Sequence, residues 1–193
     1  MFDKRLEFSK TGRARYLSHL DTMRVFQRAL TRTEIPVAYS LGFNPHMKLS
    51  IAFPLPLGAE SECEIITLKL EHPVSGFLDK LNDALPEGFC ANRELPLFNL
   101  DNITHIKYEI RFTETVENIF DGRPLIVTKK TKRGFEDLDI IPHIKDAVTD
   151  GNLLRIDLSA KPPMISPALV LAVVKLNQPE IENTMIKRIG YIM

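Results

Sequence analysis

The sequence predicts an α+β fold built from two ferredoxin-like or ferredoxin-derived halves with antiparallel sheets. In the first half, strand-like and helix-like segments follow in the order β-α-β-β-α-β within about 95 residues, the order of a split βαβ unit. The right-handed crossover then places both helices on one face of a four-stranded sheet. In the second half, a strand pattern restarts at residues 103–113 with apolar residues at alternate positions. We therefore expect domains at residues 1–97, with the SHLD and GFNPH motifs, and 98–193.

Apolar periodicity and turn residues divide the first half into elements. Ser18 with Asp21 three residues later forms an acidic capping-box pattern, so a helix is expected to begin there and to end before Pro36. Pro54 and Pro56 exclude a central strand around them, because proline cannot donate to a sheet ladder. The expected strands are 4–10, 37–40, 48–53, 63–70 and 89–95, and the expected helices are 18–33 and 75–85.

The second half also has the pattern of a mixed, antiparallel unit. Residues 129–134 (KKTKRG) lie between two strand-like segments and indicate a basic β-hairpin. Whether this half repeats the topology of the first is left open, because the helix needed after Thr113 is at best the short stretch 117–120. The expected strands are 103–113, 123–128, 135–141, 153–158 and 185–192, and the expected helix is 166–176.

Composition and motifs exclude several classes of protein. Of the 193 residues, 44% are hydrophobic and 26% are charged, which excludes a disordered or collagen-like chain. Cys63 and Cys90 form no CxxC pair, so neither a disulfide framework nor a zinc or iron–sulfur site is expected. The sequence contains no nucleotide-binding or common hydrolase motif, and we expect no cofactor. The longest apolar run, 168–174, is far shorter than a membrane span, and the charged N-terminus is unlike a signal peptide; we therefore expect a cytoplasmic protein with no membrane association.

The charge of the chain is balanced in total but segregated along the sequence. Lys and Arg number 25, as do Asp and Glu, so net charge gives no argument for wholesale binding to nucleic acid. Residues 1–50 carry nine basic residues against four acidic ones, whereas residues 51–100 carry three against eight. Two interpretations stay open: opposite charges neutralise each other across one domain, or the N-terminal segment presents a functional basic face.

The clearest basic face lies on the helix expected at 18–33. The apolar side of its helical wheel carries Leu20, Met23, Phe26 and Leu30. The opposite side carries arginines spaced by four residues, Arg24, Arg28 and Arg32. Arg13 and Arg15 precede the helix and would extend this row toward the N-terminus, which also favours anions. We count Asp21 with them as a candidate substrate contact; the alternative is a solvated surface on which Asp21 and Arg24 form an ordinary ion pair.

A candidate acid–base site combines the first turn of this helix with the loop that follows it. The glycine and the Asn-Pro pair of GFNPH fix the loop and present Asn44, His46 and Lys48 outward. With His19 they would suit general acid–base catalysis, because histidine titrates near neutral pH and lysine can stabilise developing negative charge. We expect the rings of His19 and His46 to lie within about 10 Å of each other. Alternatively, His19 is a core histidine, or the histidines and Asp21 bind a metal; their spacing matches no recognised ligand pattern, so no metal site is expected.

The basic hairpin offers a second candidate surface. Lys130, Lys132 and Arg133 stand near its tip, where they could contact the backbone of a nucleic acid. Charged hairpin tips also protect sheet edges from pairing, which is the alternative interpretation. RNA binding of the RRM type is not expected, because the strand at 63–70 (CEIITLKL) has no aromatic residue.

Residues 15–30 (RYLSHLDTMRVFQRAL), 36–53 (PVAYSLGFNPHMKLSIAF) and 54–61 (PLPLGAES) together resemble the radical-SAM-linked protein family, a domain of unknown function. The resemblance is specific over residues 10–70 and looser beyond them. Members of that family typically occur beside, or fused behind, a B12-binding radical SAM protein. The resemblance therefore implies such a partner, encoded separately because this sequence has no radical SAM cluster motif. The matching residues are Ser18, His19, Asp21, Arg24, Arg28, Gly42, Phe43, Asn44, Pro45, His46, Lys48, Gly58 and Ser61.

Two functions from different classes follow from these observations. The first is a radical-SAM-associated accessory module that binds a polyanionic substrate, RNA, for a partner enzyme. The second is a metal-independent ribonuclease or related acid–base catalyst that uses His19 and His46. The resemblance implies no reaction, and a distant likeness to the ferredoxin-like RNA-processing RAMP proteins of CRISPR systems is an analogy of fold alone. Whether the chain is an enzyme is left open.

Overall fold

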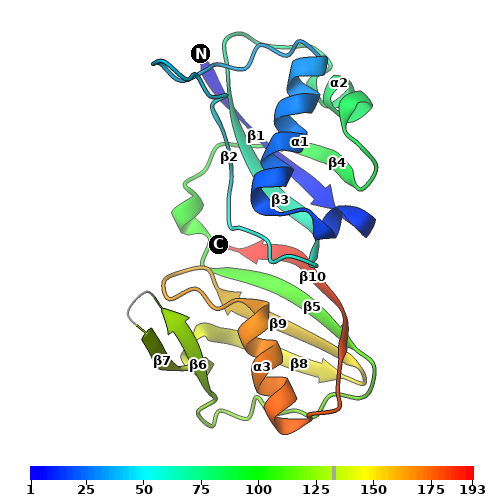
Figure 1. The fold of residues 1–193 in the computed structure, drawn as a ribbon, viewed down its shortest axis with the longest axis vertical. Coiled ribbons are helices and arrows are strands. Elements are labelled where there is room, and N and C mark those ends of the chain that lie inside the picture. The colour runs from blue at the N-terminus through cyan, green and yellow to red at the C-terminus, as the bar shows by residue number, and fades with distance from the viewer. Residues whose placement is uncertain (132–133) are drawn as a thin grey trace. The chain divides into compact units, whose positions relative to one another are not determined.

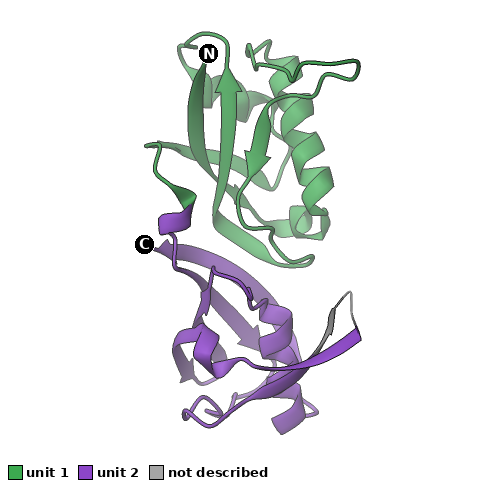
Figure 2. Cartoon of the chain, turned by 90° about the vertical axis from the view of Figure 1, so that its left-hand side faces the viewer, with its two compact units in different colours: residues 1–100 green, residues 101–193 purple. Residues whose placement is uncertain are grey.

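The chain folds into two units that each combine an antiparallel sheet with helix. The computed structural model describes residues 1–131 and 134–193 (Figure 1). By their internal contacts, residues 1–100 form one compact unit and residues 101–193 form a second (Figure 2). We call them unit 1 and unit 2. The α+β class expected from the sequence is confirmed.

Unit 1 has the strand order of a split βαβ fold. Its elements are β1 (Phe2–Lys10), the 3-10 turn η1 (Gly12–Tyr16), α1 (His19–Arg32), β2 (Leu49–Ile51), β3 (Glu60–Leu70), α2 (Phe77–Ala84) and β4 (Phe89–Leu95). Antiparallel pairing of β1 with β4, β1 with β3 and β2 with β3 gives the order β4-β1-β3-β2. Two βαβ crossovers that share one sheet produce this order.

The core of unit 1 lies between its sheet and its two helices. Phe26 of α1 packs edge-on against Phe8 of β1, with ring centroids 4.6 Å apart, and against Phe89 of β4 at 6.0 Å. Leu30 of α1 and Leu81 of α2 belong to the same buried cluster. Because one stripe of α1 is held in this core, the opposite stripe faces solvent.

Helix α1 begins and ends where the sequence predicts, within one residue. Ser18 is its N-cap: the Ser18 hydroxyl accepts a hydrogen bond from the Asp21 amide at 3.1 Å and donates one to the Asp21 carboxylate at 2.7 Å. This cap satisfies an amide that helix geometry leaves without a partner in the helix. The last helical residue is Arg32, and Thr33 is the C-cap.

Two residues of the predicted apolar side of α1 lie outside the buried core. Leu20 is 65% exposed and Met23 is half-buried, whereas Thr22 is buried. Thr22 can enter the core because its hydroxyl donates to the Ser18 carbonyl at 2.9 Å, which satisfies that polar group. Leu20 precedes Arg24 by four residues and therefore lies on the same side of the helix as that arginine. The buried positions of α1 are Thr22, Phe26, Ala29 and Leu30.

Unit 2 repeats the strand order of unit 1 but has a different element after its first strand. Its elements are β5 (His105–Phe112), β6 (Ile126–Thr131), β7 (Gly134–Asp139), β8 (Ile144–Asp150), β9 (Leu153–Ser159), α3 (Pro167–Asn177) and β10 (Asn183–Ile192). Four of these strands pair antiparallel in the order β10-β5-β9-β8, which is the unit 1 order with β5 as the first strand and β10 as the last. β6 and β7 form a separate ribbon in the connection where unit 1 has α1.

The structure answers one open question about unit 2 and adds one strand. No helix forms at residues 117–120, because the connection after β5 forms the β6–β7 ribbon instead. β8 lies within residues 144–150, where the sequence predicts no strand. Its sequence, IKDAVTD, alternates poorly because β8 stands at the edge of the sheet order and is exposed at most of its positions.

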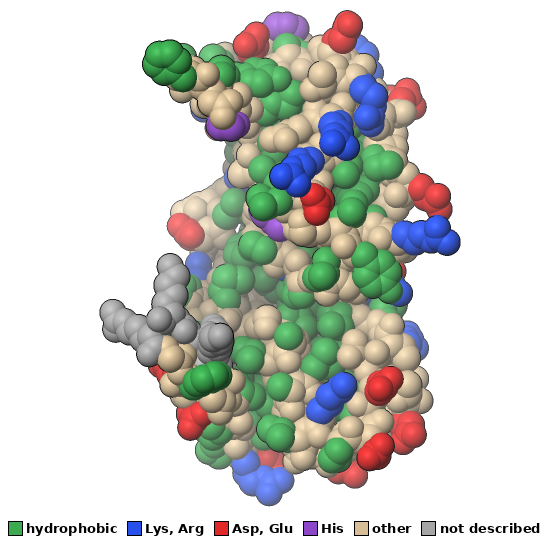
Figure 3. Space-filling model, in the orientation of Figure 1, with side chains coloured by type: hydrophobic (Ala, Val, Ile, Leu, Met, Phe, Trp, Pro, Cys, Tyr) green, Lys and Arg blue, Asp and Glu red, His purple; other side chains and the backbone are tan. Residues whose placement is uncertain are grey.

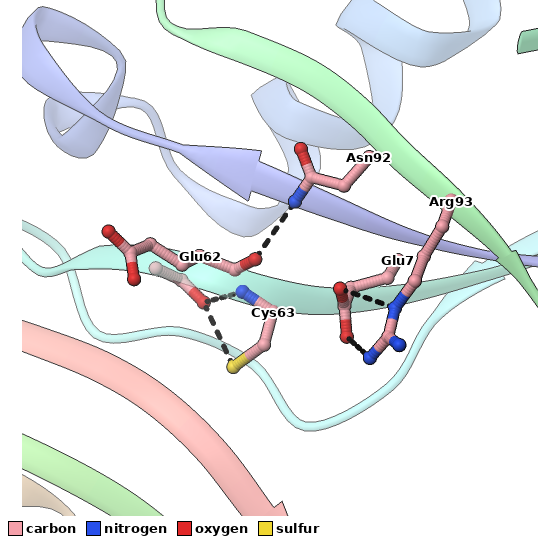
Figure 4. A network of polar contacts seen from close by, with 6 residues as sticks. Glu7, Glu62, Cys63, Asn92 and Arg93 are labelled. Carbon is pink, nitrogen blue, oxygen red and sulfur yellow. Dashed lines mark hydrogen bonds and ion pairs between the residues drawn. The ribbon is translucent and has the colours of Figure 1, made fainter.

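Ion pairs within unit 1 join the basic and the acidic segments of the sequence in both directions. The pairs are Lys4 with Glu94, Arg15 with Glu60, Lys69 with Asp3 and Arg93 with Glu7. In the last pair, the Glu7 carboxylate accepts two hydrogen bonds from Arg93 at 2.9 Å, and nearby Asn92 donates to the backbone carbonyl of Glu62 at 2.9 Å (Figure 4). Neutralisation within one unit therefore explains part of the charge segregation, but these four pairs do not include the arginines of α1.

Candidate nucleic-acid interface

Three arginines form a row on the solvent-facing side of α1. Arg24, Arg28 and Arg32 are exposed, as the sequence predicts, and Figure 3 shows basic side chains following one another over this helix. Consecutive arginines are four residues apart, so the row is about 12 Å long at about 1.5 Å per residue. A row of this length can contact successive phosphates of one nucleic-acid strand.

Each arginine of the row has a different setting. Arg24 pairs with Asp21 at 2.8 Å, and both side chains are largely exposed. Arg32 donates to the carbonyl of Ala84, the last residue of α2, where the helix dipole favours a positive charge. In the described part of the chain, no acidic side chain forms an ion pair with Arg28. Arg28 is therefore the arginine of the row with the least compensated charge.

Asp21 connects the N-cap of α1 to the arginine row. The pKa of Asp21 lies below its ordinary range, first because its carboxylate accepts a hydrogen bond from the Ser18 hydroxyl and then because it accepts one from Arg24. The carboxylate is thus ionised beside Arg24 and would compete with a phosphate. Because ion pairs exposed to solvent contribute little to stability, a phosphate could replace this carboxylate at small cost.

The two arginines before α1 differ from each other. Arg13 lies in η1 and is exposed. Arg15 is half-buried: one guanidinium nitrogen donates to the Tyr16 hydroxyl at 2.8 Å, and another lies 3.6 Å from the Glu60 carboxylate. Arg15 therefore has partners within unit 1, whereas the exposed Arg13 is the better placed of the two to extend the row.

The segment after α1 forms a narrow loop whose base is held by hydrogen bonds; we call residues 38–48 the α1–β2 loop. The Ser40 amide donates to the His46 carbonyl at 2.8 Å, and the His46 amide donates to the Ser40 hydroxyl at 2.9 Å. One step closer to the sheet, the Lys48 amide donates to the Ala38 carbonyl at 2.8 Å. These bonds fix the two arms of the loop against each other.

The tip of the α1–β2 loop is apolar and stands in solvent. Leu41 is 98% exposed, and Phe43 is fully exposed. Gly42 between them has a φ of +119°, a backbone conformation that residues with a side chain rarely adopt. Asn44, which the sequence predicts to face outward, is also exposed. The turn thus presents a phenylalanine to solvent next to the predicted polar residues.

The base of the α1–β2 loop lies against the middle of α1. A hollow of about 240 Å³ is lined by Gln27, Tyr39, Pro45, His46 and Met47. Gln27 follows Arg24 by three residues, so the two side chains are neighbours on the helix surface and the hollow adjoins the arginine row at Arg24. Tyr39 is 47% exposed and His46 is exposed, so both rings are accessible to a ligand that enters the hollow.

The residues of the predicted acid–base site occupy more than one place. His46 lines the hollow beside α1, whereas Lys48 lines another hollow, of about 320 Å³, that includes Asp3 and Lys69. His19 is half-buried in the first turn of α1, eight residues before Gln27, which corresponds to about 12 Å along the helix axis. A common site for His19 and His46 stays a prediction.

The predicted basic hairpin lies partly outside the described residues. Lys132 and Arg133 fall there. Lys130 belongs to β6, where its backbone stands opposite Phe135 of β7. Binding of a nucleic acid by these three residues stays a prediction.

Neither a metal cluster nor a membrane-spanning helix is found in the described part of the chain. Within residues 1–131 and 134–193, His, Cys, Asp and Glu side chains do not come together in a group of three or more that could hold a metal ion. The helices described there are all too short or too polar to cross a membrane.

Sequence reasoning missed the two aromatic residues of the α1–β2 loop. The sequence places Phe43 only within the GFNPH motif, and it predicts Tyr39 within a strand at 37–40, where the structure has isolated bridges at Val37 and Tyr39 instead. Phe43 stands between Gly42 and the Asn-Pro pair, in a turn that cannot reach the core. A large apolar residue inside such a turn was the signal that could have revealed its exposure.

A buried lysine that positions the start of α1 was also missed. Lys10 is 2% exposed, and its ammonium group donates to the Leu17 carbonyl at 2.6 Å, one residue before the N-cap. Burial lowers the pKa of Lys10, and the nearby charge of Glu64 opposes that shift. The signal was strand alternation, because Lys10 follows Leu6 and Phe8 at intervals of two.

Comparison with known proteins identifies a family for this chain. The model of the family described as "Uncharacterized protein conserved in bacteria (DUF2344)" matches residues 4–177. The matched residues include all of α1, the α1–β2 loop and α3. A comparison with curated proteins gives no match. Because the family match covers most of the chain, this protein belongs to the DUF2344 family of uncharacterised proteins conserved in bacteria.

Proposed function

We propose that this protein is an accessory module that binds RNA, a polyanionic substrate, for a separately encoded B12-binding radical SAM enzyme. The observation that carries the proposal is the row of Arg24, Arg28 and Arg32 on the solvent-facing side of α1. Most of the energy of non-specific nucleic-acid binding comes from cations that neutralise phosphates. A neutral chain can use this energy only if its cations are gathered on one surface, as they are along α1.

The setting of the row supports binding to phosphates over a purely structural role. Surface arginines that serve stability usually pair with carboxylates of the same protein, as Arg93 does with Glu7. In the described part of the chain Arg28 has no such ion pair, and the pair of Arg24 with Asp21 is exposed to solvent. Both guanidinium groups can therefore reach a ligand without breaking a buried interaction.

The partner in this proposal rests on the sequence resemblance. The SHLD and GFNPH motifs resemble the radical-SAM-linked family, whose members occur beside or fused to a B12-binding radical SAM protein. This chain's sequence carries no cluster motif of its own, so the radical chemistry would belong to the partner. The module would hold the RNA in reach of that enzyme.

A salt titration tests RNA binding. The affinity of a fluorescein-labelled RNA of about 12 nucleotides is measured by fluorescence anisotropy over a range of salt concentrations. The logarithm of the affinity should fall linearly with the logarithm of the salt concentration, by about 0.7 for each phosphate contacted on a single strand. Arg28→Ala should reduce this slope by about one contact, whereas Arg28→Lys should retain it.

Arg123→Ala is the matched control for this titration. Arg123 is an exposed arginine of unit 2 that pairs with Asp121 at 2.8 Å, much as Arg24 pairs with Asp21. This variant should bind with the wild-type slope. Absence of binding at low salt, or an equal loss of slope in Arg123→Ala and Arg28→Ala, would contradict the proposal.

A separate experiment tests the partner. A tagged form of the protein is purified from its native host, and the proteins that elute with it are identified by mass spectrometry. A B12-binding radical SAM protein should co-elute in a stoichiometric amount. If purification repeatedly yields the protein without it, while RNA binding is present, the partner part of the proposal is wrong and the RNA part stands.

A further inference from the structure

The α1–β2 loop has an aromatic tip that the arginine row does not explain. Phe43 is fully exposed although a phenylalanine gains about 1.5–3 kcal/mol when it is buried. The hydrogen bonds between Ser40 and His46 join the two arms of the loop below the turn that carries the ring. A turn whose arms are joined in this way loses less conformational freedom than an open loop when a ligand binds to it.

The hollow beneath this tip is small and contains two further rings. Tyr39 and His46 both line it, and both are accessible from solvent. Its volume of about 240 Å³ is below the 300–1,000 Å³ of typical drug-sized ligand sites. The hollow therefore has room for one flat ring system, and not for an extended cofactor.

The aromatic groups stand beside the positive charges. Gln27 lines the hollow and follows Arg24 by three residues in α1, a spacing that makes the two side chains neighbours on the helix surface. A basic row next to aromatic faces is the combination by which proteins hold single-stranded nucleic acid, because phosphates meet the cations while bases stack on the rings. A protein partner would match the apolar tip but would not by itself account for the adjoining arginines.

We propose that the α1–β2 loop is a base-stacking platform for single-stranded RNA. The hollow between Tyr39 and His46 receives one unpaired base, Phe43 stacks on a second, and the phosphates of the same strand lie along the arginine row. This inference rests on the proposed function and specifies its substrate as a single strand. A duplex does not fit the platform, because its bases are already stacked on one another.

Binding of a labelled oligouridylate of about 12 nucleotides tests the platform, with an RNA duplex of the same length for comparison. Phe43→Ala should weaken binding of the single strand about 5-fold or more, the range found when a stacking ring is removed. Phe43→Leu should weaken it as much, because leucine is apolar but offers no flat ring. Tyr39→Leu should also weaken binding. The salt slope should stay at the wild-type value in all three variants, because no phosphate contact is lost.

Leu41→Ala is the matched control, because Leu41 is as exposed as Phe43 and lies two residues away but cannot stack on a base. It should bind like the wild type. If the wild-type protein binds RNA but Phe43→Ala and Tyr39→Leu bind equally well, or if the duplex binds as tightly as the single strand, the platform is wrong and the proposed function stands. If the wild-type protein binds no RNA at low salt, the proposed function itself fails.

Two further outcomes separate the platform from its alternatives. Wild-type affinity in Phe43→Leu, together with weak binding in Phe43→Ala, would show that the tip needs an apolar side chain and not an aromatic one; this overturns stacking and points to a protein partner. A deoxyribo-oligonucleotide of the same base sequence separates the two sources of unpaired bases. Weaker binding of the DNA supports RNA as the ligand, and equal or tighter binding overturns the RNA assignment.

Discussion

Units 1 and 2 share one strand order but differ in the connection that follows their first strand. In unit 1 this connection is α1, which packs Phe26 and Leu30 into the core and presents arginines to solvent. In unit 2 it is the β6–β7 ribbon, whose two strands pair only with each other in the described residues. A four-stranded sheet evidently tolerates either element at this position. The helix gives unit 1 a surface with regularly spaced cations, whereas the ribbon gives unit 2 an extension.

The two connections should also differ in what they contribute to stability. A helix with one face in the core is stabilised by that packing, whereas an isolated two-stranded ribbon is marginal in water. Phe26 of α1 is fully buried, but Phe135 of β7 is 77% exposed. The same substitution at these two positions therefore compares the elements directly.

The largest effect is expected for Phe26→Ala. Removal of a fully buried phenylalanine should lower the free energy of unfolding by about 3–5 kcal/mol, because transfer energy is lost and a cavity is left among the core rings. Phe135→Ala should change it by less than about 0.5 kcal/mol. Hydrogen exchange read from peptides of each unit would measure both. Similar losses in the two variants would contradict the difference between helix and ribbon.

The next effect compares two glycines with almost the same φ angle. Gly88 of unit 1 has a φ of +88° and Gly122 of unit 2 has a φ of +89°. At Gly88 a Cβ atom would come 2.7 Å from the Thr11 carbonyl oxygen, whereas at Gly122 it would meet nothing within 4 Å. Gly122→Ala should therefore lower the free energy of unfolding by about 1–2 kcal/mol, the strain of a side chain at positive φ. Gly88→Ala should lower it by the same amount and by about 1–3 kcal/mol more, because of the clash. Equal thermal stabilities of the two variants would show that the turn at η1 can relax.

The helix caps give a smaller contrast between the units. Ser18 caps α1 with a hydrogen bond to the Asp21 amide, whereas the side chain of Ser166, the N-cap residue of α3, makes no capping hydrogen bond in the described chain. Ser18→Ala should lower the unfolding free energy by about 0.5–2 kcal/mol, and Ser166→Ala should have less effect. Denaturant midpoints of the two variants measure this difference. A larger loss for Ser166→Ala would contradict it.

The smallest expected effect is a difference in pH dependence. The pKa of Asp21 is lowered in unit 1, so the stability it contributes is complete above about pH 3.9 and is lost as pH falls through its lower folded pKa. In unit 2 the pKa of His105 is lowered, first by burial and then by Lys145, with Asp157 opposing. The stability that the neutral His105 ring contributes to unit 2 is therefore complete above about pH 6.5, the pKa of an unperturbed histidine. It is lost as pH falls from that value through the lower pKa of the folded state.

On acidification, the stability that His105 contributes to unit 2 should therefore be lost at a higher pH than the stability that Asp21 contributes to unit 1. Hydrogen exchange of each unit from about pH 7 to below about pH 3.9 would measure this, with His105→Asn and Asp21→Asn as the variants that remove one titration each. The loss in unit 2 below about pH 6.5 should disappear in His105→Asn and persist in Asp21→Asn. The reverse pattern would contradict the assignment.

Local signals in the sequence were enough to predict most elements of unit 1. The Ser18 and Asp21 pattern placed the start of α1, and the predicted range 89–95 is that of β4. These elements are specified by nearby residues, namely a cap and a regular alternation. In unit 2, β6 and β7 overlap the strands predicted at 123–128 and 135–141, whereas β8 was not predicted, because an edge strand needs few buried residues and so lacks a strong period.

Part of the candidate site was also predictable from local signals in the sequence. Helical spacing alone placed the arginines of α1 on one exposed side. Leu20 was misplaced because the wheel did not anticipate that Thr22 could satisfy its hydroxyl within the helix and be buried. The exposure of Phe43 depends on which way the α1–β2 loop leaves the core, and no periodicity in the sequence encodes that direction.

The central claim is that the arginine row of unit 1 carries RNA binding, and one comparison of variants tests it most directly. The salt dependence of RNA affinity is measured for the wild type, for the double variant Arg24→Ala/Arg28→Ala of α1, and for Arg123→Ala/Arg155→Ala, which removes two exposed, ion-paired arginines of unit 2. Loss of the two α1 contacts should reduce the slope of log affinity against log salt by about 1.4, and the unit 2 variant should keep the wild-type slope. A wild-type slope in the α1 variant, or an equal reduction in both, would contradict the claim.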